Sequence, residues 1–159
     1  SEWLALAAQM PGGVEHRVAA DTSRQRFLCV TLGDRSYALA LAAVERVLPG
    51  RQSVMLPFGA PAGIDGAIEY GGRIVPVTDG RRWLSLDETG PASAFVVLQQ
   101  DGEQRVLAVN GVQRIVTIAG DDILLTASAD PRIAGLGTAN GRTLEILSTA
   151  ALLARQEAA

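Results

Sequence analysis

The sequence predicts a mainly β fold assembled from small barrels. About ten short apolar segments alternate with turn-forming residues, a pattern typical of β-barrels. The dipeptides Gly71-Gly72, Asp101-Gly102 and Asn140-Gly141 each stand between two such segments, and these residue types favour the tight turns of hairpins. Helical spacing is confined to a few short stretches, so neither a helical bundle nor a parallel α/β sheet is expected.

Length and charge narrow the class of protein. A chain of 159 residues suits one domain, or two small subdomains that share a core. Its 14 basic and 17 acidic residues give a formal net charge of -3, which does not favour binding to nucleic acid or to an anionic membrane. No apolar run approaches the roughly 20 residues that a membrane span requires. We therefore expect a cytoplasmic protein without direct membrane insertion.

The N-terminal stretch differs from the rest of the chain. Residues 2–9 are rich in alanine and leucine and predict a short helix, which a Pro-Gly-Gly run ends. Three large apolar side chains fall on one face of this helix: Trp3, Leu6 and Met10. The helix either packs back on the barrels or docks on a partner. A polar linker follows, so we divide the chain into an N-terminal helix and linker, 1–25, and a barrel domain, 26–156.

The first barrel strands follow the linker. Residues 27–32 and 36–41 are apolar segments on either side of a Gly33-Asp34 turn, which predicts a hairpin. Residues 42–48 fit either a helical turn or a strand, and residues 53–56 fit a short strand.

The hairpin around Gly71-Gly72 is the clearest local prediction. It joins an apolar segment that ends at Tyr70 to another that begins at Ile74. Pro76 cannot donate a ladder hydrogen bond, so the second strand should end there, lie at a sheet edge or carry a bulge.

Strands continue after this hairpin. One helical turn is expected at 80–84, with Arg81 and Arg82 on a solvated rim. Ile123 and Leu124 are expected to cover a barrel, and Ser148-Thr149 to cap a closing helix at 150–155. Further strands are predicted at residues 95–98, 105–109, 112–118, 133–137 and 143–147.

Neither a catalytic site nor a metal site is predicted. His16 is the only histidine and Cys29 the only cysteine, and neither is placed with the partners that a nucleophile or a zinc site needs. The pairs Asp87-Glu88 and Asp121-Asp122 fall in loop-like segments, where adjacent carboxylates are usually solvated. No phosphate or cofactor motif is found. The sequence favours a non-enzymatic protein that recognises partners through its surface, without a cofactor.

The central hairpin resembles a known motif. Residues 61–79 follow the pattern Pro-x-x-Ile-x-Gly-Ala-Ile-Glu-Tyr-Gly-Gly-x-Ile-Val-Pro-Val-x-Asp. In the CheW-type coupling proteins of bacterial chemotaxis the corresponding run is Pro-x-x-Ile-x-Gly-Val-x-Asn-Leu-Arg-Gly-x-Ile-Ile-Pro-Val-x-Asp. The segment at 27–39 and the later hairpin around Asn140-Gly141 are also similar to that family. The resemblance covers roughly residues 26–156.

The resemblance implies both a fold and a function. The implied fold is two five-stranded SH3-like β-barrels packed side by side, with a groove between them and short N- and C-terminal helices. The implied function is that of an adaptor between the cytoplasmic tips of methyl-accepting chemoreceptors and the regulatory domain of the histidine kinase CheA. Nine residues are expected at the partner-binding surface: Leu41, Val44, Arg46, Ile68, Glu69, Tyr70, Gly71, Gly72 and Arg73.

Four of these positions depart from the family pattern. Glu69 and Tyr70 stand where the family has asparagine and leucine. Gly71 stands where the family has arginine, and Arg46 stands where it has glutamate. Each charge-assisted hydrogen bond lost with the arginine would cost about 1.5–3 kcal/mol. We therefore expect a divergent adaptor with dedicated partners.

Two other classes of function stay open. The barrels could bind a small apolar ligand in their groove, since small residues such as Ala38 and Ala40 leave room there. Alternatively, they could pair edge to edge in a homo-oligomer. A dedicated partner other than a receptor is a further alternative.

Overall fold

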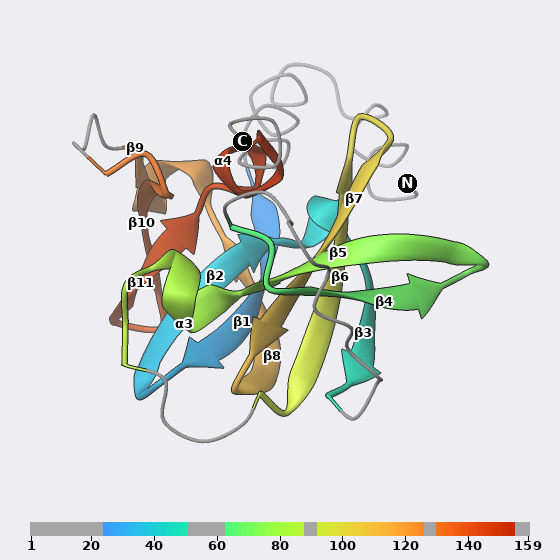
Figure 1. Cartoon of the computed structure of the whole chain (residues 1–159). Coiled ribbons are helices and arrows are strands. Elements are labelled where there is room, and N and C mark those ends of the chain that lie inside the picture. The colour runs from blue at the N-terminus through green and yellow to red at the C-terminus, as the bar shows by residue number, and fades with distance from the viewer. Residues whose placement is uncertain (1–23, 51–62, 88–91, 126–129, 155–159) are drawn as a thin grey trace, which may run out of the picture.

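Strands dominate the described part of the chain. The computed structural model describes residues 24–50, 63–87, 92–125 and 130–154, which form eleven strands, two short α-helices and two 3-10 turns (Figure 1). The predicted mainly β class is confirmed. The helix expected at 2–9 and the strand expected at 53–56 lie outside these residues.

The first sheet has six strands in the order β8-β1-β2-β11-β10-β9. Neighbouring strands are antiparallel except β2 and β11, which pair in parallel. One strand more than the expected five is present, because the three residues of β9 add to the edge beside β10. The strands are β1 (Gln25–Leu32), β2 (Arg35–Ala40), β8 (Gly111–Ile118), β9 (Ile123–Leu125), β10 (Ile133–Ala139) and β11 (Arg142–Leu147).

The second sheet has the predicted five strands, in the order β3-β6-β7-β5-β4. Only β5 and β7 pair in parallel. Figure 1 shows the two sheets side by side, with the β4–β5 hairpin extending away from the six-stranded sheet. The strands are β3 (Val44–Pro49), β4 (Gly66–Tyr70), β5 (Arg73–Asp79), β6 (Ala94–Gln100) and β7 (Glu103–Val109).

The second sheet is an insertion in the first. The chain makes β1 and β2, passes through the 3-10 turn η1 (Leu41–Ala43) into β3, and completes β3 to β7 before β8 returns to pair with β1. Residues 42–48, which fitted a helical turn or a strand, therefore form both in succession. The 3-10 turn η2 (Gly120–Asp122) joins β8 to β9.

Three hairpin turns confirm their prediction. Both residues of each dipeptide have positive φ: 59° and 79° at Gly71-Gly72, 54° and 84° at Asp101-Gly102, and 53° and 76° at Asn140-Gly141. Positive φ at both central positions gives the twist that two-residue hairpins need, and glycine, asparagine and aspartate tolerate it best.

Pro76 lies inside β5 and does not end it. It pairs with Ala67 of β4. Pairing with β7 on the other side of β5 begins only at Val77, so β5 is unpaired on that side where the proline stands.

Two local expectations are wrong. Arg81 was expected on a solvated rim, but it is buried in α3 (Gly80–Trp83) and its guanidinium bonds to the Asp79 carboxylate, which also accepts from the Arg81 backbone N–H. Arg82 is exposed as expected. Leu124 was expected to cover a barrel, but it points to solvent from β9, and Ile123 alone packs on the core.

Buried apolar side chains form three clusters. One fills the six-stranded sheet around Phe27 and Ile118, and one fills the five-stranded sheet around Val97 and Val106. The third and largest lies between the sheets and receives side chains from both, including Leu39 of β2 and Leu107 of β7. The two barrels therefore share a core and pack as one unit.

A buried arginine joins the two barrels. Arg105 of β7 is 0% exposed. One guanidinium nitrogen donates to Thr78 Oγ1 of β5 at 2.8 Å and to the Leu152 carbonyl of α4 (Thr149–Ala154) at 3.1 Å. Thr78 in turn donates to the Gly63 carbonyl at 2.6 Å. Because a guanidinium stays charged inside a protein, these acceptors are required where it is buried.

The closing helix α4 has the predicted cap. Ser148 Oγ accepts a hydrogen bond from the Ala151 N–H at 3.1 Å, and Leu152 packs in the shared core. Neither described helix has the length or the apolar content needed to cross a membrane.

Arg105→Ala should lower the free energy of unfolding by about 3 kcal/mol, because it leaves a cavity and removes the donor of two buried acceptors. Arg105→Met, which keeps much of the volume and removes the charge, should lower it less. Urea unfolding followed by circular dichroism measures both changes. The control is Arg73→Ala, at an exposed position, which should leave the midpoint unchanged. Equal urea midpoints for the Arg105→Ala and Arg73→Ala variants would contradict a role for Arg105 in joining the two barrels.

Candidate partner-binding surface

The β4–β5 hairpin presents the centre of the predicted surface. On its outer face Glu69 is exposed and pairs with Ile74, which is 63% exposed. Ile68 lies on the opposite face, in the core of the five-stranded sheet. It therefore supports the hairpin from inside. Three predicted residues are exposed at the tip: Gly71, Gly72 and Arg73.

A carboxylate bridges the two edges of the five-stranded sheet. Although β3 and β4 stand at opposite edges, the Tyr70 hydroxyl of β4 donates to Glu45 Oε2 of β3 at 3.0 Å. Gln104 Nε2 of β7 donates to Glu45 Oε1, also at 3.0 Å. The sheet therefore curls into a barrel, and side chains hold its edges together at this end.

A β-bulge brings Glu45 into this position. The register between β3 and β6 shifts between Val44 and Arg46, so Glu45 is the extra residue. A bulge bends its strand and redirects the side chains around it. As a result Glu45, Arg46 and Val47 are exposed in succession, where a regular strand would alternate.

Tyr70 and Arg46 lie close enough to interact. Partial burial raises the pKa of the Tyr70 hydroxyl, and the hydrogen bond to Glu45 raises it further, while the positive charge of Arg46 acts in the opposite direction. Arg73 stands directly opposite Tyr70 in the hairpin register. The structure thus brings Tyr70 together with Glu45 and Arg46, and the hairpin register sets Arg73 beside Tyr70.

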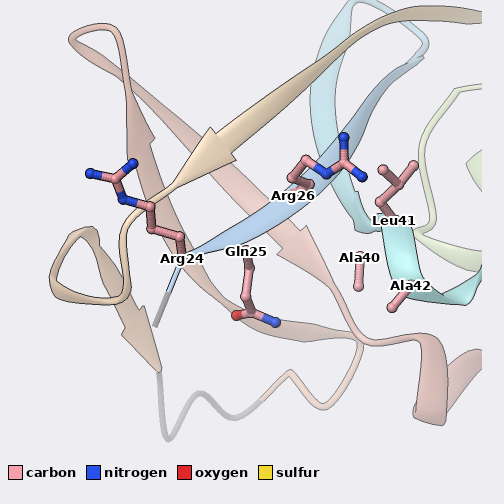
Figure 2. A pocket seen from close by; sticks show the side chains of 6 residues that line it. All are labelled: Arg24, Gln25, Arg26, Ala40, Leu41 and Ala42. Atoms are coloured by element: carbon pink, nitrogen blue, oxygen red, sulfur yellow. The ribbon is translucent and has the colours of Figure 1, made fainter. Parts of the chain in front are cut away.

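Of the two remaining predicted residues, Val44 directly precedes Glu45 in β3 and Leu41 lies in η1. Leu41 and Val44 pack partly buried against the core shared by the two sheets. Leu41 also lines an open hollow of ≈ 400 Å³ where η1 meets the start of β1, and Figure 2 shows the Arg26 guanidinium on the same side of this hollow as Leu41. Among the residues that the structure describes, those lining it are Arg24, Gln25, Arg26, Ala40, Leu41 and Ala42.

A smaller hollow opens beside the hairpin. β5 and β7 pair only over Val77–Asp79, and before this point they diverge. The gap has a volume of ≈ 190 Å³ and is lined by residues 73–76 of β5 and residues 102–104 at the β6–β7 turn. Arg73 is therefore exposed to solvent and also lines this smaller hollow.

Sequence reasoning missed Glu45, Gln104 and Ile74. Glu45 and Arg46 are adjacent charged residues in a segment that otherwise fits a strand, and such a break in alternation is a sequence signal for a bulge. The contact with Gln104 carried no such signal, since it depends on the curvature of the whole sheet.

The described residues contain no group of three or more histidine, cysteine, aspartate or glutamate side chains placed to hold a metal ion. Cys29 is buried, and burial raises the pKa of its thiol despite the opposing charge of Arg114. A thiol with a raised pKa is a weak nucleophile near neutral pH. His16 lies outside the described residues.

Glu45→Gln should lower the pKa of Tyr70, because the carboxylate that disfavours the phenolate is removed. Folding raises this pKa above its ordinary value of 10.0, so the hydroxyl stabilises the fold below that pH and the contribution is lost as pH rises through the folded pKa. The ¹³Cζ shifts of Tyr70 and Tyr37, followed against pH, measure the effect. Glu69→Gln, on the outer face of the same hairpin, is the control and should leave Tyr70 unchanged. An unaltered Tyr70 titration in Glu45→Gln would show that the hydrogen bond is absent in solution.

Two comparisons with known proteins agree with this architecture. A solved structure, the scaffolding protein TtCheW from Thermoanaerobacter tengcongensis, superposes with a TM-score of 0.72 at 19% sequence identity, covering 78% of this chain and 88% of that one. At this identity the match shows a shared fold. The family model for the CheW-like domain matches residues 26–157. Since that match spans most of the sequence, this chain belongs to the CheW-like domain family.

Proposed function

We propose that this chain is a non-enzymatic adaptor that couples the cytoplasmic tips of chemoreceptors to the regulatory domain of a CheA-type histidine kinase. The observation that carries the proposal is the family match over residues 26–157, which includes both barrels and the central hairpin. The solved relative is itself described as a scaffolding protein. Such an adaptor would act in the cytoplasm, where receptor tips and kinase meet.

The hairpin end of the five-stranded barrel supports a protein partner. Ile74 and Val47 are large apolar side chains with 63% and 42% of their surface exposed. Each is the immediate neighbour of an exposed arginine, Arg73 and Arg46. Arginine beside apolar side chains is typical of the energetically important part of protein interfaces. The Glu45 bridge stiffens this end of the barrel, so a partner would meet a formed surface.

The hollow at Leu41 supports a second contact. It lies by the junction of the two sheets, and its wall combines apolar Leu41 and Ala42 with the positive charges of Arg24 and Arg26. A helical receptor tip would place an apolar side chain in such a hollow and acidic side chains around it. Two separate surfaces on one rigid body are what an adaptor between two partners needs.

The departures from the family motif have a structural reason at Gly71. This residue has a φ of 59°, where an arginine would be strained, and the hairpin instead places its guanidinium at Arg73. At Arg46 the charge is reversed relative to the family, while the adjacent Glu45 is engaged in closing the barrel. We expect the natural partner to carry acidic or neutral groups opposite Arg46.

Binding of the purified full chain to its cognate kinase regulatory domain and receptor cytoplasmic fragment, measured by calorimetry, tests the proposal. Arg73→Ala should weaken binding to one of the two partners about tenfold, the effect of losing one charge-assisted hydrogen bond. The matched control is Arg142→Ala, because Arg142 is also exposed and follows the equivalent Asn140-Gly141 turn of the other sheet.

Two outcomes would contradict the proposal. If the wild-type chain binds neither protein, coupling is excluded, and sedimentation at several concentrations would then test self-association as the alternative. If Arg142→Ala weakens binding as much as Arg73→Ala does, the effect is one of overall charge and the hairpin is not the contact surface.

A further inference from the structure

An apolar hollow opens into the core of the six-stranded sheet. Its volume is ≈ 240 Å³, and it lies where the chain enters β1. Several of the residues that line it belong to the buried cluster of that sheet or pack against this cluster. The hollow is therefore an open end of the barrel core. The apolar residues lining it include Phe27, Ala40, Ile123, Leu125, Ala134 and Ile146.

Leu125 marks the mouth of this hollow. It is the last residue of the edge strand β9 and is 77% exposed, the most exposed of the large apolar side chains in the described residues. Leu124 beside it is 65% exposed but does not line the hollow. A large exposed leucine beside an open apolar cavity indicates a surface that something covers.

We propose that residues 2–10 of this same chain dock in the hollow, with the Trp3 indole inside it. The first 23 residues precede Arg24, and Gln25, the next residue, itself lines the hollow. Residues 11–23 then connect the docking segment to β1, and a chain can span up to about 3.3–3.6 Å per residue, so a hollow that begins at Gln25 lies within reach. A tether of this length gives an effective concentration in the millimolar range, so even a weak contact is populated.

The chemistry of the segment fits the hollow. The sequence spacing of Trp3, Leu6 and Met10 predicts that they share one face of a helix, and a face with these apolar side chains is stabilised by packing against an apolar surface. At ≈ 240 Å³ the hollow lies below the roughly 300–1,000 Å³ of sites that enclose a small-molecule ligand. Insertion of a side chain therefore suits it better than a free ligand does.

Two other segments join this region but lack suitable residues. Residues 126–129, which follow Leu125, are Thr-Ala-Ser-Ala, and residues 155–159, which follow α4, are Arg-Gln-Glu-Ala-Ala. Neither carries an apolar side chain larger than alanine.

The docked segment would also border the proposed partner site. Gln25 and Ala40 line both this hollow and the hollow that contains Leu41. The inference does not depend on the proposed function, since it concerns contacts within one chain.

Fluorine NMR of the full chain labelled with 5-fluorotryptophan tests the docking. Trp3 and Trp83 are the only tryptophans, and a Trp3→Phe variant assigns the two resonances. We expect the Trp3 resonance to differ from that of a free peptide of residues 1–23. Leu125→Ser should shift it toward the peptide value and lower the docked fraction relative to the free fraction about tenfold, since part of a leucine contact is lost. Leu124→Ser is the matched control and should leave it in place.

Three results would overturn the proposal. These are a Trp3 resonance identical to that of the free peptide, an equal response to Leu124→Ser and Leu125→Ser, or a shift that disappears on dilution, which would assign the hollow to a second copy of the chain. Thermal melting establishes that each variant is folded. If Leu125→Ser does not fold, Ala134→Leu replaces it. This variant fills the hollow from β10, the strand paired with β9, and should release Trp3 in the same way.

Discussion

A permanent charge buried at the seam between the barrels constrains the rest of this structure. Arg105 is fully buried, so its charged guanidinium needs hydrogen-bond acceptors inside the folded protein. The acceptors come from two elements distant in sequence, Thr78 in β5 and the Leu152 carbonyl in α4. Thr78 is also bonded to Gly63, at the base of the central hairpin. The position of the hairpin and of the closing helix are thus fixed by the same buried group.

The arrangement of the exposed residues depends on this buried core. The core between the sheets receives side chains from both barrels, so neither can rotate against the other without opening it. At the far end of the five-stranded barrel, the Glu45 bridge replaces backbone pairing between β3 and β4 and leaves Arg46, Arg73 and Ile74 at the surface. A rigid interior with a partly open rim suits a protein that binds other proteins by preformed contacts.

Most of the strands could be predicted because their signals are local. Glycine, asparagine and aspartate at positive φ define the hairpins, and the apolar runs of β6 and β7 are continuous because both of their faces are buried. The candidate surface was predicted only in outline. Burial of Arg105 depends on acceptors from β5 and α4, and the Glu45 contacts depend on a bulge and on sheet curvature. No periodicity within one segment reports such distant partners.

The order of strands along the chain bears on how the protein is made. The whole five-stranded sheet lies between β2 and β8, and β1 pairs with β8 through contacts as distant as Gln25 with Ile118. On the ribosome, β3 to β7 would emerge and could close while the β1–β2 hairpin still waits for its neighbours. Such non-local pairing is slow to form, and an unpaired apolar strand is open to aggregation until it forms. Assembly of the first barrel is therefore the vulnerable late step in the synthesis of this domain.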